Sequence, residues 1–93
     1  MDNNIKTLIE NELYKRVVTP IEVYIREIMT VSMKCEAKAK VYPEILKEIN
    51  TFSREHKVDA NEVVDLLKQI FKERKNMLSF YHILWAKSRI KNS

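Results

Sequence analysis

The sequence has no glycine, two prolines, one cysteine and two histidines among its 93 residues. Tight β-turns and the phosphate-binding loops of P-loop and dinucleotide-binding proteins depend on glycine, so this sequence excludes such loops and disfavours a sheet. A single cysteine, Cys35, cannot form an internal disulfide framework, which predicts a reducing compartment and a cytoplasmic location. No apolar run approaches the length of a membrane span, so we expect no membrane partner.

The residues that usually carry catalysis or bind metals are sparse. His56 and His82 fall in different predicted helices, and neither has a neighbouring nucleophile at a recognisable spacing. Cys35 occupies a heptad position, which indicates a small core residue. No set of side chains has the spacing of a zinc site. We therefore expect a protein without enzymatic activity, bound metal or cofactor.

The residues that are present predict an all-α fold. A content of 45% hydrophobic and 32% charged residues is typical of a globular chain, and 93 residues make one domain of three to four helices. Thr19 and Pro20 resemble an N-cap followed by a first helical residue, so a new helix is expected there. Pro43 either separates two helices or kinks one long helix. The predicted helical segments are residues 4–17, 20–40, 43–56, 60–75 and 76–90.

A capped pair of amphipathic helices, from Tyr42 to Lys75, forms the centre of the predicted domain. Asp59 is the expected N-cap of the second helix, and Glu62 three residues later fits a capping box. The apolar positions of the pair repeat at helical spacing: Ile45, Leu46, Ile49 and Phe52, then Val63, Leu66, Leu67, Ile70 and Phe71.

Two further patterns favour an intertwined homodimer. The segment 20–40 carries a heptad stripe: Ile21, Ile25, Ile28, Ser32, Cys35 and Ala39. The last predicted helix has one face with Leu78, Tyr81, Leu84 or Trp85, and Ser88. Its aromatic residues beside Lys87 are compatible with a membrane surface, but the interpretation we favour is burial of Tyr81 and Trp85 in a small core.

Positive charge is concentrated after residue 33. Residues 1–33 contain four basic and five acidic side chains, whereas residues 34–93 contain thirteen basic and eight acidic ones. Such asymmetry indicates a polyanionic partner, although a solvated lysine-rich face is the alternative. Glu62 and Asp65 would repel phosphates at the start of the second helix, which argues against a base-reading recognition helix. The candidate phosphate contacts are Lys47, Arg54, Lys57, Lys68, Lys72, Arg74 and Lys75, and we expect them on one flank.

The stretch from Tyr42 to Lys75 resembles the small double-stranded-DNA-binding co-regulators of late transcription in T-even-type phages and, more distantly, the bacterial GapR group. The pattern shared by both groups consists of Leu46, Lys47, Glu48, Ile49, Arg54, Val58, Asp59, Leu66 and Leu67, and the phage proteins are also matched at Tyr42 and Glu44. The resemblance implies a phage protein, contact with the transcription machinery, and phosphate contacts by Lys47, Arg54 and Lys68. The chain departs from the family at 55–57, where it lacks the family's glycine, and at Val64 and Asp65, where the GapR group is basic.

Two functions from different classes remain open at this point. The first is non-enzymatic binding of double-stranded DNA through its backbone, as a homodimer. The second is a small helical protein-interaction module, either an inhibitor of a host protein or an immunity-type protein, whose lysines serve solubility.

Overall fold

A computed structural model describes the backbone of residues 2–30 and 34–88, and the side chains of residues 4–26 and 41–88. Within these ranges the chain is all-α, as predicted, and contains no strand. The elements are α1 (Asp2–Leu8), η1 (Ile9–Leu13), α2 (Tyr14–Thr30), α3 (Lys34–His56), α4 (Ala60–Glu73) and α5 (Met77–Lys87). Because α1, η1 and α2 follow each other without a break, they form one long helical arm.

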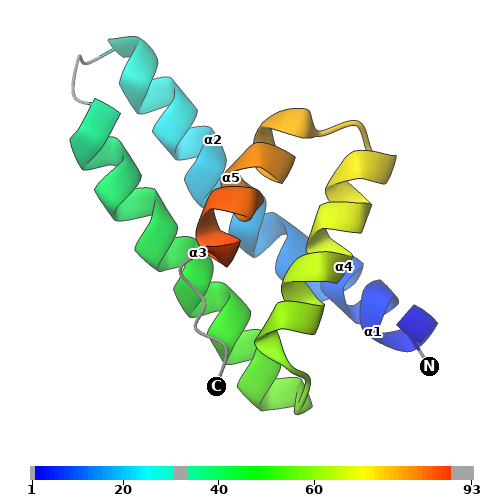
Figure 1. Cartoon of the computed structure of the whole chain (residues 1–93). Coiled ribbons are helices and arrows are strands. Elements are labelled where there is room, and N and C mark those ends of the chain that lie inside the picture. Colours follow the sequence, from blue (N-terminus) through cyan, green and yellow to red (C-terminus); the bar gives the residue numbers. More distant parts are fainter. Residues whose placement is uncertain (1, 31–33, 89–93) are drawn as a thin grey trace.

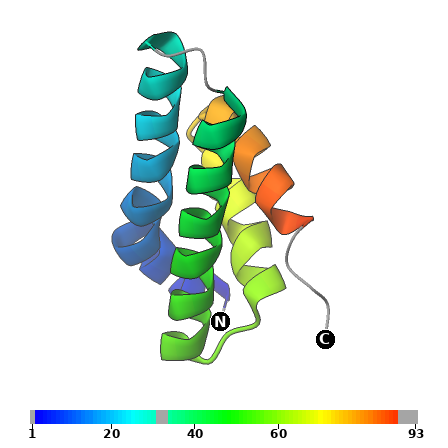
Figure 2. The same cartoon turned by 90° about the vertical axis from the view of Figure 1, so that its left-hand side faces the viewer.

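The arm packs beside α3 as an antiparallel helical hairpin (Figure 1). The chain then turns back at residues 57–59, and α4 runs beside the first half of the arm while α5 lies between α3 and α4. Figure 2 shows α3 in front of the other helices, with α5 on one side of it and the arm on the other. The hydrophobic core fills the space between these elements and includes residues from all of them except α1.

A π-helical turn, η1, keeps the buried residues of the arm in line. Ile9, Leu13, Val17 and Ile21 are all fully buried and are spaced by four residues at each step. In a uniform α-helix such a series would rotate by about 40° per step, because 3.6 residues complete a turn. The wider turn at Ile9–Leu13 absorbs part of this rotation. The arm therefore presents one apolar stripe to α3 and α4.

The two prolines do not interrupt helices, which corrects two of the predicted boundaries. Pro20 lies inside α2, so residues 4–17 and the start of 20–40 belong to one arm and no helix starts at Thr19. Pro43 lies inside α3, so the segment 43–56 is the second part of a helix that begins at Lys34. Proline removes one hydrogen bond to the carbonyl four residues earlier. Pro43 is exposed and Pro20 half-buried, so water can reach the carbonyl that each proline leaves unpaired.

The central capped pair forms as predicted. The Asp59 carboxylate accepts hydrogen bonds from the backbone N–H groups of Asn61 and Glu62, at 3.1 and 3.3 Å, which confirms it as the N-cap of α4. The predicted apolar stripe of α4 is buried except for Leu66, which is half-buried, and it gains Val64. The predicted end of this helix at residue 75 is two residues too long, since α4 ends at Glu73. Likewise, α5 begins at Met77, one residue after the predicted start, because Asn76 is its N-cap.

The two patterns that favoured the dimer have different outcomes. The heptad stripe does not lie on one helix, because α2 ends at Thr30, α3 begins at Lys34 and the two helices are antiparallel (Figure 1). Ile21 is buried in the chain's own core and Ile25 is half-buried against it, while the side chains from 27 to 40, including Cys35, are not described. The core interpretation of Tyr81 and Trp85 is wrong: these side chains are 58% and 46% exposed.

Candidate nucleic-acid interface

Apart from Lys68, the candidate phosphate contacts fall into two groups, one on α3 and the turn after it, the other at the end of α4 and in the turn that follows. The first cation group is Lys47 and Arg54 on α3 and Lys57 in the turn after it. The second cation group is Lys72 near the end of α4, with Arg74 and Lys75 in the turn that follows. Because α4 has 14 residues, about 21 Å of helix separates the two turns. The two turns are therefore separate sites of positive charge, and the expectation that all seven cations share one flank stays a prediction.

The first cation group occupies the outer face of α3. Lys47 and Arg54 are seven residues apart, so they point in nearly the same direction, opposite the buried Ile45 and Ile49. Two acidic residues of α3, Glu44 and Glu48, line a shallow groove together with Lys15, Arg16, Thr19 and Pro20 of α2. Cations from the arm therefore face Glu44 and Glu48, and the outer face of α3 carries Lys47 and Arg54 together with the exposed carboxylate of Glu55.

Both turns contain a lysine in the left-handed backbone region. Lys57 has φ 56° and Lys75 has φ 58°. In each turn the following N–H bonds to a carbonyl five residues back, Val58 to Ser53 at 3.0 Å and Asn76 to Phe71 at 2.8 Å. This is the Schellman ending, in which the left-handed position is normally glycine because a Cβ is unfavourable there. A chain without glycine has thus placed a lysine at the end of α3 and another at the end of α4.

Five of the seven candidate cations form no ion pair with another described residue. Among the described residues, no ion pair is formed by Lys47, Arg54, Lys57, Lys72 or Lys75, and all five are exposed. Their side chains are accordingly available to an external anion.

Arg74 is the member of the second cation group that the fold already uses. Its guanidinium lies 3.6 Å from the Glu10 carboxylate and 4.4 Å above the ring of Tyr14. It ties the turn after α4 to the helical arm, so its contribution to a phosphate site is smaller than that of its neighbours. Lys6 bonds Glu73 at 2.9 Å nearby, and this hydrogen bond lowers the pKa of Glu73 below its usual value.

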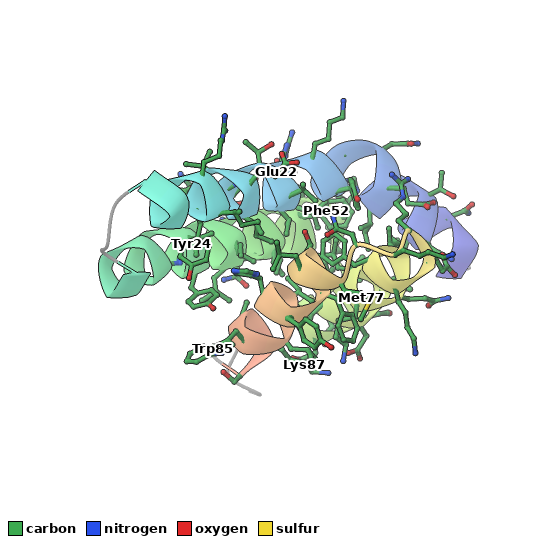
Figure 3. The ribbon with its side chains drawn as sticks, turned by 90° about the horizontal axis from the view of Figure 1, so that it is seen from above. Glu22, Tyr24, Phe52, Met77, Trp85 and Lys87 are labelled. Carbon is green, nitrogen blue, oxygen red and sulfur yellow. The ribbon has the colours of Figure 1, made fainter. Side chains whose placement is uncertain are left out.

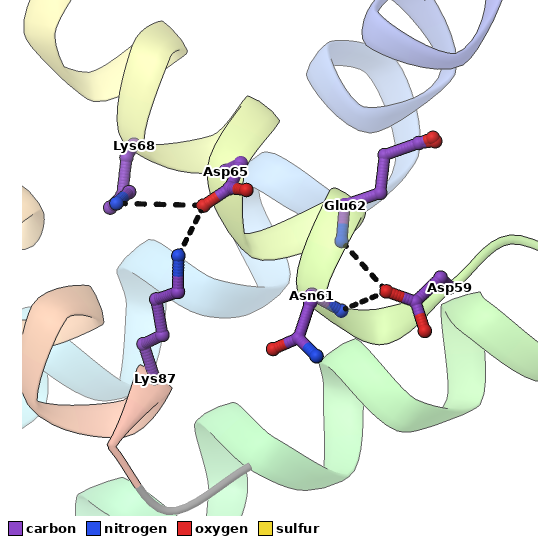
Figure 4. A network of polar contacts seen from close by, with 6 residues as sticks. All are labelled: Asp59, Asn61, Glu62, Asp65, Lys68 and Lys87. Carbon is purple, nitrogen blue, oxygen red and sulfur yellow. Dashed lines mark hydrogen bonds and ion pairs between the residues drawn. The ribbon is translucent and has the colours of Figure 1, made fainter. Parts of the chain in front are cut away.

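Lys68 is held by Asp65 together with Lys87 of α5 (Figure 4). The Asp65 carboxylate accepts a hydrogen bond from Lys87 at 2.6 Å and lies 3.5 Å from the Lys68 ammonium. The hydrogen bond from Lys87, assisted by both positive charges, lowers the pKa of Asp65, and the same bond raises the pKa of Lys87. The carboxylate thus repels a phosphate less than an isolated Asp65 would, and Lys68 is only partly available.

The N-terminal arm, whose role the sequence left open, positions both turns. Glu12 lies 3.3 Å from Nε2 of His56, the last residue of α3, and Glu10 reaches Arg74 in the other turn. The two glutamates project from η1, where Ile9 and Leu13 are buried in the core. The sequence signal was a pair of acids two apart among apolar residues at four-residue spacing, but their partners, 44 and 64 residues away, could not be read from it.

The structure can also be compared with the two expectations of no bound metal and no membrane span. No group of three or more His, Cys, Asp or Glu side chains in the described ranges is close enough to hold a metal ion. None of the helices described is both long and apolar enough to cross a bilayer. Lys34, Lys38 and Lys40, which would extend the basic surface along α3, have side chains outside the described residues.

Comparisons with protein-family models, with curated proteins and with solved structures gave no match to this chain.

Proposed function

We propose that the protein binds double-stranded DNA through its phosphate backbone, without enzymatic activity, and does so as a homodimer. The observation that carries this proposal is the pair of exposed lysines, Lys57 and Lys75, at left-handed positions on either side of α4. A non-glycine residue in that region costs about 1 kcal/mol or more, and such strain is concentrated at functional sites. A role for the two ammonium groups accounts for both positions at once.

The spacing of the two cation groups suits a duplex better than a single phosphate. A separation of about 21 Å along α4 exceeds the major-groove width of about 12 Å, so the two groups can contact phosphates on either side of a groove but not one phosphate together. One group would contact each backbone. Lysine and arginine side chains on phosphates fix the position of a protein but do not read sequence. The proposal therefore predicts little preference among duplex sequences.

The extension to a phage protein that assists late transcription or DNA organisation is supported by the resemblance of residues 42–75 alone. The matched positions Lys47 and Arg54 belong to the first cation group, whereas the second cation group lies mostly outside the matched pattern. Contact with transcription machinery is part of the same extension.

Salt-titrated fluorescence anisotropy on a random 20-base-pair duplex tests the proposal. Five available cations per copy predict that log K falls with log salt with a slope of about −4.5 for each copy bound. Lys57→Ala and Lys75→Ala should each reduce the slope by about one. Lys15→Ala is the matched control, since Lys15 is an exposed lysine that lines the groove with Glu44 and Glu48. Equal losses in all three variants, or no duplex binding at 50 mM salt, would contradict the proposal.

The alternative, a protein-interaction module, is favoured by a different observation: the exposed apolar side chains of α5. Such a module would bind one protein partner, and Lys57→Ala and Lys75→Ala would leave the affinity for that partner unchanged. The same anisotropy series, repeated with single-stranded DNA and RNA of equal length, separates the functions, because a solubility role for the lysines predicts no preference for duplex DNA at any salt concentration.

A further inference from the structure

Helix α5 exposes an apolar surface that the described part of the chain does not cover. The run from Met77 to Ala86 contains no Asp, Glu, Lys or Arg. Among the residues whose side chains are described, six large hydrophobic residues are exposed, and five of them lie on this helix: Met77, Leu78, Tyr81, Leu84 and Trp85. We call these five the α5 face. Exposed apolar residues scattered singly are ordinary, but five on a helix of 11 residues mark an interaction surface.

The α5 face is opposite the side that anchors the helix. At about 100° per residue, its five members fall within about 60° on either side of Tyr81, and the buried residues lie on the reverse side. Those buried residues are Ser79, His82, Ile83 and Ala86. His82 is fixed by a 2.8 Å hydrogen bond from Nδ1 to the Leu78 carbonyl and by edge-on packing against Tyr24. The helix is therefore held in one orientation, and the α5 face points outward.

Trp85, near one end of the α5 face, is also held in a fixed orientation. Trp85 stacks on Tyr42 of α3, with ring centroids 5.3 Å apart and planes 5° from parallel, so its ring is fixed although it is 46% exposed. In Figure 3, Met77 and Trp85 lie at the two ends of α5. An aromatic side chain that is already ordered loses little entropy when a partner covers it.

We propose that a second copy of the chain covers the α5 face, with the two α5 helices antiparallel about a two-fold axis at Tyr81. The spacing of the face is compatible with this occupant. Its members lie three and four residues before Tyr81 and three and four residues after it. A two-fold interface requires that each contact be repeated with the roles exchanged. In this arrangement Met77 and Leu78 of one copy meet Leu84 and Trp85 of the other, and Tyr81 meets Tyr81.

The size and charge of the face agree with a self-associating surface. The exposed fractions correspond to about 500 Å² of side-chain surface per copy, against about 800 Å² per partner in a standard interface that includes its polar rim. This area is at the low end for a protein–protein interface, so we expect a weak dimer. An uncharged face also avoids the like-charge contacts that a two-fold axis would otherwise create. At its edge, the ammonium of Lys87 is already paired with Asp65.

This inference rests on the homodimer in the proposed function and specifies its interface. It adds a second pair of cation groups to the assembly, so one dimer would release twice as many counterions from DNA as one chain. Pairing itself needs no DNA, and it is tested in its absence.

The experiment uses the full chain with Cys35→Ser, so that cysteines can be introduced singly. Under mild oxidation without DNA, the further change Tyr81→Cys should give a disulfide-linked dimer, because a residue at a two-fold axis lies next to its own copy. Gln69→Cys, at an exposed position on α4, is the matched control and should remain monomeric. Sedimentation of the chain with its native residues from about 1 to 100 µM should show a monomer–dimer equilibrium, and Tyr81→Glu should raise the dissociation constant at least about 100-fold with the circular dichroism of a helical protein retained.

Each possible result of these experiments either supports or overturns the proposed pairing of two α5 helices. A chain that stays monomeric to 100 µM overturns the inference, including the case in which the α5 face binds another protein or a lipid vesicle. A dimer that tolerates Tyr81→Glu, or that cross-links equally through Gln69→Cys, uses a different face and also overturns it. If the Tyr81→Cys dimer forms but no duplex is bound, pairing stands and the DNA-binding proposal fails.

Discussion

Helices α4 and α5 follow each other in the chain and share one core, yet their outer surfaces differ. α4 buries five apolar residues, and outside this stripe its surface is largely charged or polar, with cations toward its C-terminus. α5 buries four residues and exposes five large apolar ones. The comparison teaches that the fold of one chain accounts for every apolar residue of α4 but for only part of those of α5. The outer surface of α4 is charged and polar, as suits contact with water or an anion, whereas that of α5 leaves five large apolar side chains exposed.

The largest expected difference between the two helices appears when one aromatic side chain is removed from each. Phe71 of α4 is fully buried and its ring lies 5.4 Å from that of Tyr14, so Phe71→Ala should reduce the free energy of unfolding by about 3–5 kcal/mol. Tyr81→Ala on the α5 face should change it by no more than about 0.5 kcal/mol at concentrations where the chain is monomeric. Urea unfolding followed by circular dichroism at about 1 µM measures both.

The same pair of variants gives an internal check at higher concentration. If a second copy covers Tyr81, the Tyr81→Ala loss should grow with protein concentration, while the Phe71→Ala loss should not. A large, concentration-independent loss for Tyr81→Ala would mean that its ring is part of the monomer core, and the contrast between the helices would disappear.

The sequence was sufficient where the controlling contacts are local. The start of α4 followed from Asp59, whose carboxylate bonds N–H groups only two and three residues away. The buried stripe of α4 followed from its 3.6-residue period. The rule for proline was local too, but it failed at Pro20 and left Pro43 open between a helix boundary and a kink. Packing of the arm against α3 stabilises both helices through these positions.

The candidate site was predicted residue by residue but not in its arrangement. Whether Lys47 and Lys72 share a flank depends on how α3 and α4 cross, which no spacing encodes. The pairing of Arg74 with Glu10, and of Lys68 with Asp65 and Lys87, depends on contacts between distant parts of the chain. Tyr81 and Trp85 were assigned to the core because aromatic residues usually lie there; their exposure became visible only when α5 was seen to be anchored by its opposite side.

The N-caps of the two helices offer a smaller test. Asp59→Ala should reduce the free energy of unfolding by about 1 kcal/mol, since two N–H groups of α4 lose their acceptor. Asn76→Ala should cost a similar amount, because the Asn76 amide oxygen accepts from the Ser79 N–H at 3.2 Å and its amide nitrogen donates to the Tyr14 hydroxyl at 3.4 Å. Asp59→Ser, which keeps a capping oxygen, is the control in thermal unfolding and should recover most of the loss. No change in Asp59→Ala would show that α4 is held by packing alone.

Replacing the two left-handed lysines with glycine separates stability from binding. Lys57→Gly and Lys75→Gly should each raise the free energy of unfolding by up to about 1 kcal/mol, because the Cβ at φ near 57° is removed. The same variants should lower the affinity for duplex DNA and reduce the salt slope by about one each. Thermal unfolding and anisotropy on the same samples measure the two effects. Variants that are more stable and bind DNA as tightly as the parent would remove the functional reason for these lysines.

The smallest effect concerns the ion pair that joins the two helices, Asp65 of α4 with Lys87 of α5. The lowered pKa of Asp65 means that its contribution to stability is complete above the ordinary carboxyl pKa of about 4 and is lost as the pH falls through the lower value of the folded state. The raised pKa of Lys87 means that the contribution persists through neutral pH and is lost only as the pH rises through that higher value. Since both side chains are more than one third exposed, the pair should contribute only a few tenths of a kcal/mol.

Asp65→Asn should therefore lower the melting temperature slightly between about pH 5 and pH 9 and leave it unchanged near pH 2, where the parent carboxylate is protonated. Glu55→Gln, which removes an exposed carboxylate that forms no ion pair among the described residues, should show no such pH-dependent difference. If Asp65→Asn instead tightens DNA binding at low salt by more than Glu55→Gln does, Lys68 released from Asp65 joins the phosphate contacts. A loss of dimer in Asp65→Asn would place Lys87 inside the interface between copies. The contrast between a charged α4 surface and an apolar α5 surface would then hold for only part of α5.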